Sequence, residues 1–322
     1  MTNKQISFQK KAAIVLIISG AVLFNGTLQT SIVKNSISIS FSIRIMLYAI
    51  GVVLVAFGSW LHYRAKQYAA KNFAEKIANR NSDNDLLFLR PFSEDSTFNK
   101  TLKGSHTTTV MQNLQSTVEE DLYKVFEPFG NLIAIGKPGE KLPVPGAVRT
   151  YADADWKDAV TDKMKKSQLI IIQGGEGGEG FNWELQQAFK VVDSKKILIF
   201  IPQMSKKGYD KFRHLALENI AVELPDRESI KKTKAYFDSG FVRFTENRTP
   251  EFLPLTAPIF RVNPYNPFHA RFYYTLKPLF EEYGIEWKTP PFIKAYVVAL
   301  SVLGIFILIL IVLAILSAFG KI

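Results

Sequence analysis

The feature that most constrains this chain is an apolar run near its C-terminus, Ala295–Gly320, which contains no charged residue. A helix needs about 20 consecutive apolar residues to cross the hydrocarbon core of a bilayer. The run is longer than this, and it has no polar face for the surface of a water-soluble domain. We therefore predict a membrane-spanning helix here, with a buried core helix as the alternative.

Two further apolar segments near the N-terminus predict two more spans, Ala12–Leu28 and Phe41–His62. Arg44 lies near one end of the second segment, where its long side chain can reach the headgroups. Trp60 and Tyr63 lie at the other end, as interfacial aromatic residues do. A cleaved signal peptide is the alternative for the first segment, but no small-residue cleavage site precedes the second apolar run.

Lysine and arginine residues flank these two segments unequally. They precede the first segment and follow the second, whereas the connection carries Lys34, with Arg44 at its edge. The flanking residues are Lys4, Lys10, Lys11, Arg64, Lys66, Lys71, Lys76 and Arg80. Cytoplasmic segments are enriched in Lys and Arg, so we place the N-terminus and the central region in the cytoplasm. The net charge of +11 fits contact with anionic lipid, and a lipid bilayer is the first expected partner.

Composition excludes several kinds of chemistry. The chain has no cysteine, which rules out disulfides, thiolate catalysis and Cys-ligated metal. Its histidines are scattered without paired ligand spacing at His62, His106, His214 and His269, so we expect no metal site and no bound cofactor. The basic cluster of Lys231, Lys232 and Lys234 lacks the interleaved aromatic residues of single-strand binders, and we do not expect nucleic acid as a partner.

Between the spans, short apolar strands alternate with helical patterns. The expected strands are Asp85–Arg90, Asn131–Ile135, Leu169–Ile172, Lys196–Pro202 and Gly240–Phe244. This alternation predicts an α/β fold, a flavodoxin-like parallel five-stranded sheet with flanking helices. In the helix with apolar positions from Val110 to Val125, we expect Glu119, Glu120 and Asp121 to lie mostly on the polar side.

The organisation that we predict has five parts. They are an N-terminal transmembrane hairpin (1–63), a helical connector (64–84), a cytoplasmic α/β domain (85–248), a membrane-proximal extension (249–291) and a C-terminal transmembrane helix (292–322). The connector is basic and either contacts lipid headgroups or is solvated. The extension contains several prolines and one helical pattern, Phe268–Tyr283.

The strand–turn–helix segment Ser167–Phe189 contains the main candidate residue, Glu184. We expect Glu184 in the first turn of its helix, where a carboxylate complements the helix dipole. The functional alternative is that it points into the crevice at the carboxyl ends of the strands. There it would bind ribose hydroxyls or stabilise an oxocarbenium-like transition state. Phe181 and Trp183 could stack on a base or belong to the core, and for Trp183 we favour the core.

A second candidate cluster follows the second expected strand and contains Gly136, Lys137, Gly139 and Arg149. Glycines allow close approach of the backbone, and the two cations could bind phosphate. No Walker A motif is present, and a flexible loop is the alternative. Arg90 ends the first strand and belongs to the same edge of the sheet, unless it only pairs with an acidic residue of the following loop. The glycine-rich turn, residues 174–180, contains two glutamates that would repel phosphate, and we interpret it as a mobile lid.

The order of these parts resembles the Toll/interleukin-1 receptor (TIR) domain in its divergent bacterial forms. The resemblance lies in the first strand and acidic loop (DLLFLRPFSED), the long loop after the second strand (GKPGEKLPVPGAVR) and the aromatic–Glu–Leu signature of Phe181, Trp183, Glu184 and Leu185. It covers about residues 85–244. The chain departs from the family pattern where Phe181 stands at the usual place of the signature tryptophan.

The resemblance implies a membrane-anchored signalling or anti-phage defence protein of the bacterial inner membrane, multi-pass, with its main domain cytoplasmic. In enzymatically active members the glutamate that matches Glu184 cleaves the nicotinamide–ribose bond of NAD, so NAD is the expected substrate. Such domains generally self-associate to complete the site. The alternative is a non-enzymatic sensor or adaptor that binds a nucleotide or a partner domain and is coupled to the membrane spans.

Overall fold

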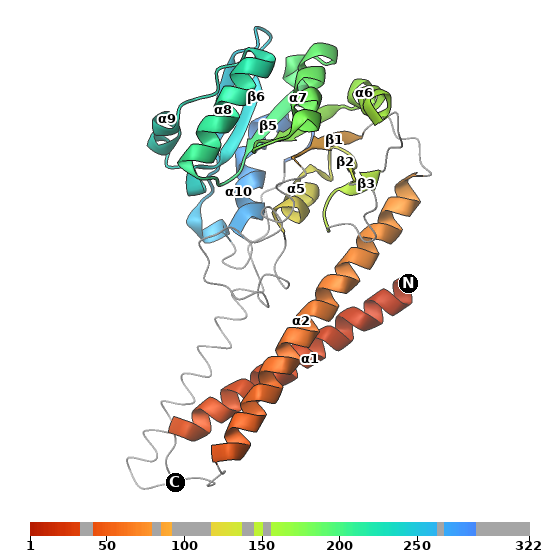
Figure 1. The fold of residues 1–322 in the computed structure, drawn as a ribbon, viewed down its shortest axis with the longest axis vertical. Coiled ribbons are helices and arrows are strands. Elements are labelled where there is room, and N and C mark those ends of the chain that lie inside the picture. The colour runs from red at the N-terminus through yellow and green to blue at the C-terminus, as the bar shows by residue number, and fades with distance from the viewer. Residues whose placement is uncertain are drawn as a thin grey trace. The chain divides into compact units, whose positions relative to one another are not determined.

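A computed structural model describes residues 1–32, 41–78, 85–91, 117–136, 145–150, 156–262 and 267–287 (Figure 1). The chain divides into two compact units, Met1–Leu255 and Thr256–Ile322. The third predicted span, Ala295–Gly320, lies outside the described residues, as do Lys137 and Gly139 of the predicted phosphate cluster.

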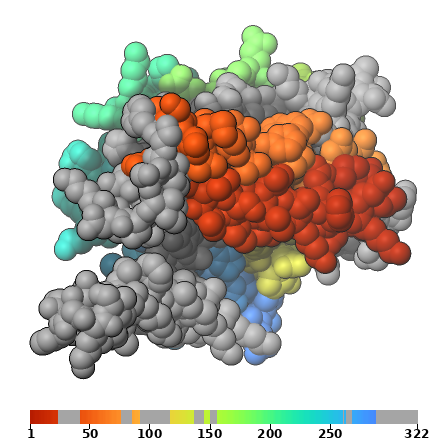
Figure 2. Space-filling view, turned by 90° about the horizontal axis from the view of Figure 1, so that it is seen from below, coloured from red at the N-terminus to blue at the C-terminus, as the bar shows by residue number. Residues whose placement is uncertain are grey.

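The first unit begins with two long helices, α1 (Asn3–Ile32) and α2 (Phe41–Ala78), which pack side by side (Figure 2). Both contain a segment long and apolar enough to cross a membrane, Asn3–Leu23 and Ser42–Glu75, and in each an apolar stretch of 18 residues is only 17% buried. α2 extends well beyond the second predicted span, so one uninterrupted helix covers this span and most of the predicted connector.

Glycines allow α1 and α2 to approach closely. A Cβ atom on Gly20 would lie 2.6 Å from the carbonyl oxygen of Gly51, and one on Gly58 would lie 2.9 Å from the carbonyl oxygen of Ala13. Small residues at such crossings bring helix backbones together, which increases the van der Waals contact that holds membrane helices.

The α/β class is confirmed by a sheet of seven strands in the order β3-β2-β1-β4-β5-β6-β7. The strands are β1 (Leu86–Leu89), β2 (Leu132–Ile135), β3 (Val148–Thr150), β4 (Leu169–Gln173), β5 (Ile197–Ile201), β6 (Gly240–Phe244) and β7 (Pro250–Pro254). β1 runs parallel to both neighbours, with Leu87 opposite Ile133 of β2 and Ile170 of β4.

The prediction of a five-stranded, wholly parallel sheet is wrong in two respects. The sheet has two further edge strands, β3 and β7, and both β6 and β7 run antiparallel to their neighbours. Ile201 at the end of β5 pairs with Gly240 at the start of β6. The chain therefore returns through α8 (Lys206–Ile220), α9 (Arg227–Lys232) and η3 (Tyr236–Asp238) to the edge that it left, which reverses the next strand.

Both faces of the sheet are buried, as expected where helices cover a parallel sheet. α6 (Trp156–Lys166), α7 (Glu179–Val191) and α8 pack on one face through a single apolar cluster (Figure 1). Alternate strand residues belong to this cluster, including Leu87, Leu89, Ile170, Ile172, Ile197 and Ile199. α5 (Val118–Phe126) contributes a second buried apolar surface with Leu122, Val125 and Phe126.

The C-terminal half of α2 packs against the β3 side of the sheet and against α5. Lys66 of α2 pairs with Glu120 of α5 at 3.2 Å, and both side chains are largely buried. The ring of Phe73 meets Tyr123 edge-on, and Ala74 packs on the apolar pair Ile133 and Val148. Glu120 also completes the capping box of α5, because it accepts a hydrogen bond from the backbone N–H of Thr117 at 2.7 Å.

The second unit contains η4 (Ile259–Arg261), α10 (Pro267–Thr275) and α11 (Lys277–Glu282). The single helix predicted over Phe268–Tyr283 is therefore two helices. Pro278 explains the break, because it has no N–H for a continuing helix and its ring clashes with the preceding turn. Trp287 folds back on α10 and donates its indole N–H to the carbonyl oxygen of Tyr273 at 2.9 Å.

Candidate functional site

The carboxyl ends of the parallel strands bring three residues to one edge of the sheet, the predicted site residues Arg90 and Gly136 and the polar residue Gln173. Arg90 follows β1, Gly136 follows β2, and Gln173 ends β4. Because Leu89 lies opposite Ile172, Arg90 and Gln173 occupy the next positions of neighbouring strands, on the face opposite to Leu89. Open α/β sheets bind ligands at this edge.

Glu184 lies in the second turn of α7, not in the first turn as predicted, because the helix begins at Glu179. Its carboxylate therefore does not cap the helix, and the N-cap position is Gly178. The neighbouring residues Phe181 and Leu185 are buried in the apolar cluster with Leu89 of β1. This packing draws Glu184 inward, and only 6% of the residue is exposed.

Burial raises the pKa of Glu184 from its ordinary value of 4.5 to about 7, and attraction by the positive charge of Arg90 offsets part of this effect. Desolvation disfavours a carboxylate, whereas a nearby cation favours it. A carboxyl group with a pKa near neutrality exchanges protons readily at physiological pH. Such shifts are concentrated at functional sites.

Glu119 forms the centre of a buried ionic cluster beside this position. It pairs with Arg149 through an Nη1–Oε1 contact of 2.6 Å and accepts a hydrogen bond from Arg149 Nη2 at 3.0 Å. Arg90 Nε lies 3.7 Å from Oε2, the oxygen that also accepts from Arg149 Nη2, and the backbone N–H of Ala147 donates to Oε1 at 3.0 Å. Gly146, with φ of +143°, leaves room for the Glu119 side chain.

The placement of the glutamates in α5 corrects the prediction that they lie on a polar face. Glu119 is fully buried and Asp121 is 1% exposed, whereas Glu120 contacts Lys66. Glu119 turns inward because two arginines from the sheet require a counter-charge; such buried charges are stable only when paired. In this cluster the guanidinium group of Arg149, which was predicted to bind phosphate, instead pairs with the buried carboxylate of Glu119.

The remaining predicted residues are dispersed. Gly136 is buried at the end of β2, and Phe181 is a core residue that is 5% exposed. Trp183 packs edge-on against Trp156, with ring centroids 4.9 Å apart, and the ammonium group of Lys157 lies 5.4 Å from its ring. Trp183 thus covers the apolar cluster at its rim, in agreement with the core interpretation.

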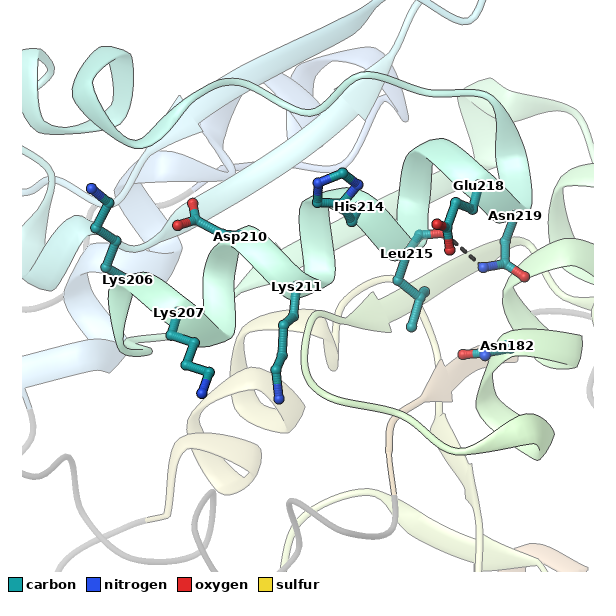
Figure 3. A pocket seen from close by; sticks show the side chains of 9 residues that line it. All are labelled: Asn182, Lys206, Lys207, Asp210, Lys211, His214, Leu215, Glu218 and Asn219. Atoms are coloured by element: carbon teal, nitrogen blue, oxygen red, sulfur yellow. Dashed lines mark hydrogen bonds between the residues drawn. The ribbon is translucent and has the colours of Figure 1, made fainter.

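The glycine-rich turn is tied to α8. Glu176 pairs with Lys211 at 2.8 Å, and a Cβ on Gly174 would come within 2.7 Å of the Phe212 ring. Beside this turn lies a shallow surface groove of about 590 Å³, which Glu184 does not line. Figure 3 shows its side chains, which are Asn182, Lys206, Lys207, Asp210, Lys211, His214, Leu215, Glu218 and Asn219.

The sequence did not predict that two polar residues, Glu119 and Gln173, are buried near this edge of the sheet. Gln173 is 1% exposed, and its Oε1 accepts no hydrogen bond from the residues that the structure describes. The available signal for Gln173 was a polar residue at the end of the apolar strand LIIIQ. For the described ranges, no group of three His, Asp or Glu residues is arranged to hold a metal ion.

In comparisons with known proteins, no family model matches this chain, and neither a curated protein nor a solved structure matches it.

Proposed function

We propose that this protein is a membrane-anchored TIR-like signalling or defence protein whose cytoplasmic domain cleaves the nicotinamide–ribose bond of NAD through Glu184. One observation carries the proposal: Glu184, in the second turn of the helix that follows β4, is 6% exposed and has a pKa of about 7, and the charge of Arg90 favours its ionised form. The strand order β2-β1-β4-β5 also supports it, because it corresponds to the first four strands of the flavodoxin-like order.

The proposed reaction breaks the bond between the ribose carbon and the nicotinamide nitrogen. The bonding electron pair leaves with nicotinamide, and positive charge develops on the ribose. The ionised Glu184 carboxylate stabilises this charge, as carboxylates do in glycoside hydrolysis. Water then attacks the ribose carbon and releases its proton, so the products are nicotinamide, ADP-ribose and one proton. Arg90 favours the ionised form that this role requires.

The test is NAD turnover by the 322-residue chain in lipid nanodiscs. We expect Glu184→Gln to reduce turnover by about 100-fold or more, since the neutral amide cannot stabilise the developing cation. Glu179→Gln is the matched control, because Glu179 is an exposed residue of the same helix. Equal turnover in the wild type and in Glu184→Gln would remove Glu184 from the mechanism.

A binding function is the second candidate, and the groove beside α8 favours it. This groove is open to solvent and is not lined by Glu184, as expected of an adaptor that binds a nucleotide or another protein domain without chemistry. NAD that binds the purified chain in calorimetry, with no nicotinamide released over hours, would support this candidate over the enzyme.

The membrane part of the proposal places the protein in the bacterial inner membrane, with the N-terminus and the α/β domain in the cytoplasm. The long apolar segments of α1 and α2 support this placement, together with the lysine and arginine residues that flank them. We also propose that the α/β domain self-associates and that the membrane spans hold the copies together.

A further inference from the structure

One flank of α2 carries a stripe of aromatic side chains around an arginine. Trp60, Arg64 and Tyr68 follow one another at intervals of four residues, which places them one above another on the same side of the helix. The central carbon of the Arg64 guanidinium lies 5.4 Å from the centroid of the Trp60 ring and 5.9 Å from that of the Tyr68 ring. Phe57 continues the stripe toward the apolar half of α2, and its ring stacks on Trp60 with centroids 5.7 Å apart. The attraction between a cation and aromatic faces thus orients the guanidinium in advance of any ligand.

This aromatic stripe lies away from the two surfaces that α2 packs against. The α/β domain contacts α2 through Lys66 and Phe73. Lys66 comes two residues after Arg64, which turns it by about 200° around the helix. Gly58 contacts α1 on a third side, and Trp60 is 47% exposed. The stripe is therefore open to the medium that surrounds α2.

The position of Arg64 along α2 matches the edge of a bilayer. Arg44 and Arg64 are 20 residues apart, and no Asp, Glu, Lys or Arg lies between them. This length of helix rises about 30 Å, which is the thickness of the hydrocarbon core. Trp60 lies one turn inside Arg64, at the depth where tryptophan is enriched in membrane proteins. A guanidinium group at this level meets the headgroup phosphates of the lipids.

Further cations lie beside this level on α1. The two helices are in contact on both sides of Arg64, since Gly58 packs on Ala13 and Asn72 donates a hydrogen bond to the carbonyl oxygen of Met1 at 2.9 Å. The segment of α1 between these contacts contains three lysines, Lys4, Lys10 and Lys11. In the part of the chain that the structure describes, neither these lysines nor Arg64 pairs with a carboxylate. The charge here is complementary to an anion at the membrane surface.

We propose that Arg64, oriented by Trp60 and Tyr68, binds the phosphate of an anionic phospholipid. The planar guanidinium group donates two parallel hydrogen bonds to phosphate oxygens, and Phe57 contacts the acyl chains. A zwitterionic headgroup fits less well, because its own ammonium group would be repelled by the lysines of α1. This inference rests on the membrane placement in the proposed function and is independent of NAD cleavage.

The test measures how tightly the detergent-solubilised full chain binds phosphatidylglycerol in neutral mixed micelles, by microscale thermophoresis at constant ionic strength. We expect Arg64→Gln to weaken binding roughly tenfold, because hydrogen bonds between charged groups contribute about this factor. Lys11→Gln is the matched control, since it removes the same charge from an exposed residue of α1 outside the stripe. It should change the affinity less than twofold, and both variants should bind phosphatidylcholine as weakly as the wild type does.

Two milder variants separate the geometry of the site from its charge. Arg64→Lys keeps the charge but loses the planar group that binds two oxygens at once, and it should weaken binding roughly threefold. Trp60→Leu keeps an apolar side chain but removes one aromatic face, and it should have an effect of similar size, roughly threefold. Circular dichroism of each variant in the same detergent confirms that the helices are retained.

Equal losses in Arg64→Gln and Lys11→Gln would overturn the inference, because binding would then follow total charge. Replacing chloride by inorganic phosphate should not displace the lipid, and displacement would show that the ligand is a free phosphate. If the stripe is instead a contact between copies of this chain, Arg64→Gln would change the oligomeric state in analytical ultracentrifugation and leave the affinity for phosphatidylglycerol at the wild-type value.

Flotation with phosphatidylcholine vesicles distinguishes failure of this inference from failure of the membrane placement. A chain that does not float with these vesicles would contradict the membrane placement and, with it, the lipid site. A chain that floats with them but binds phosphatidylglycerol no more tightly than phosphatidylcholine would contradict the lipid site alone.

Discussion

Glu119 and Glu184 are both buried glutamates, but the protein surrounds their carboxylates differently. Glu119 contacts two guanidinium groups and a backbone N–H, and these stabilise its negative charge. Phe181 and Leu185, on the same helix as Glu184, belong to the apolar cluster, and burial is the largest cause of the raised pKa of Glu184. The second environment is the one suited to a carboxyl group that changes its protonation state near neutral pH.

The raised pKa of Glu184 predicts a pH-dependent stability. Because the folded state binds this proton more tightly than the unfolded state, the contribution is fully present below pH 4.5 and is lost as pH rises to about 7. The loss amounts to about 3 kcal/mol. Glu184→Gln should therefore match the wild type near pH 4.5 and be more stable at pH 8, as measured by chemical denaturation of the full chain.

Glu179→Gln serves as the control for this measurement, since the exposed Glu179 should give the same difference from the wild type at both values of pH. A constant difference between Glu184→Gln and the wild type across this range would show that the carboxyl group is not perturbed by folding.

At the level of residues, the sequence predicted the surroundings of Glu184 better than those of Glu119. The strand–turn–helix pattern around Glu184 is local, and α7 begins only two residues before the expected position. Glu119 lies 30 positions before its partner Arg149, and β3, which presents this partner, has no hydrophobic pattern of its own. A buried ion pair between distant segments leaves no periodicity in the sequence.

Among the elements, the five predicted strands agree with the structure to within one residue at each end, because buried strands of parallel sheets are continuous apolar runs. β3 contains three residues and β7 begins and ends with proline, so neither has this pattern. The antiparallel direction of β6 could not be predicted from the sequence, because an apolar run indicates a strand but not its direction.

The contact between α1 and α2 predicts a stringent requirement for glycine. Gly20→Leu would force its side chain against Gly51 and Val55, and such overpacking costs about 1–3 kcal/mol. We expect a lower melting temperature of the detergent-solubilised chain and weaker association of the two helices. Val22→Leu is the control, because Val22 is 64% exposed on the same helix; equal melting temperatures for the two variants would contradict the close packing.

For the whole molecule, the chain offers a direct test of membrane orientation, because it contains no cysteine. Single cysteines at Thr2, at Ser36 between the two predicted spans and at the exposed Lys232 would report on three segments. In intact bacterial cells, we expect a membrane-impermeant maleimide to label only Ser36→Cys, and a permeant one to label all three variants. Labelling of Lys232→Cys by the impermeant reagent would contradict a cytoplasmic domain.

The two edge strands of the sheet, β3 and β7, affect how copies of this protein would associate at high concentration. Ala74 of α2 packs on Val148 at the β3 border, and at the other border Pro250 and Pro254 lack the N–H groups that a further strand would need. Proteins confined to a bilayer meet at high local concentration, where unprotected strand borders promote aggregation. This sheet is protected against such growth at both ends, so copies that gather in the membrane would meet through their helices rather than by extending one another's sheets.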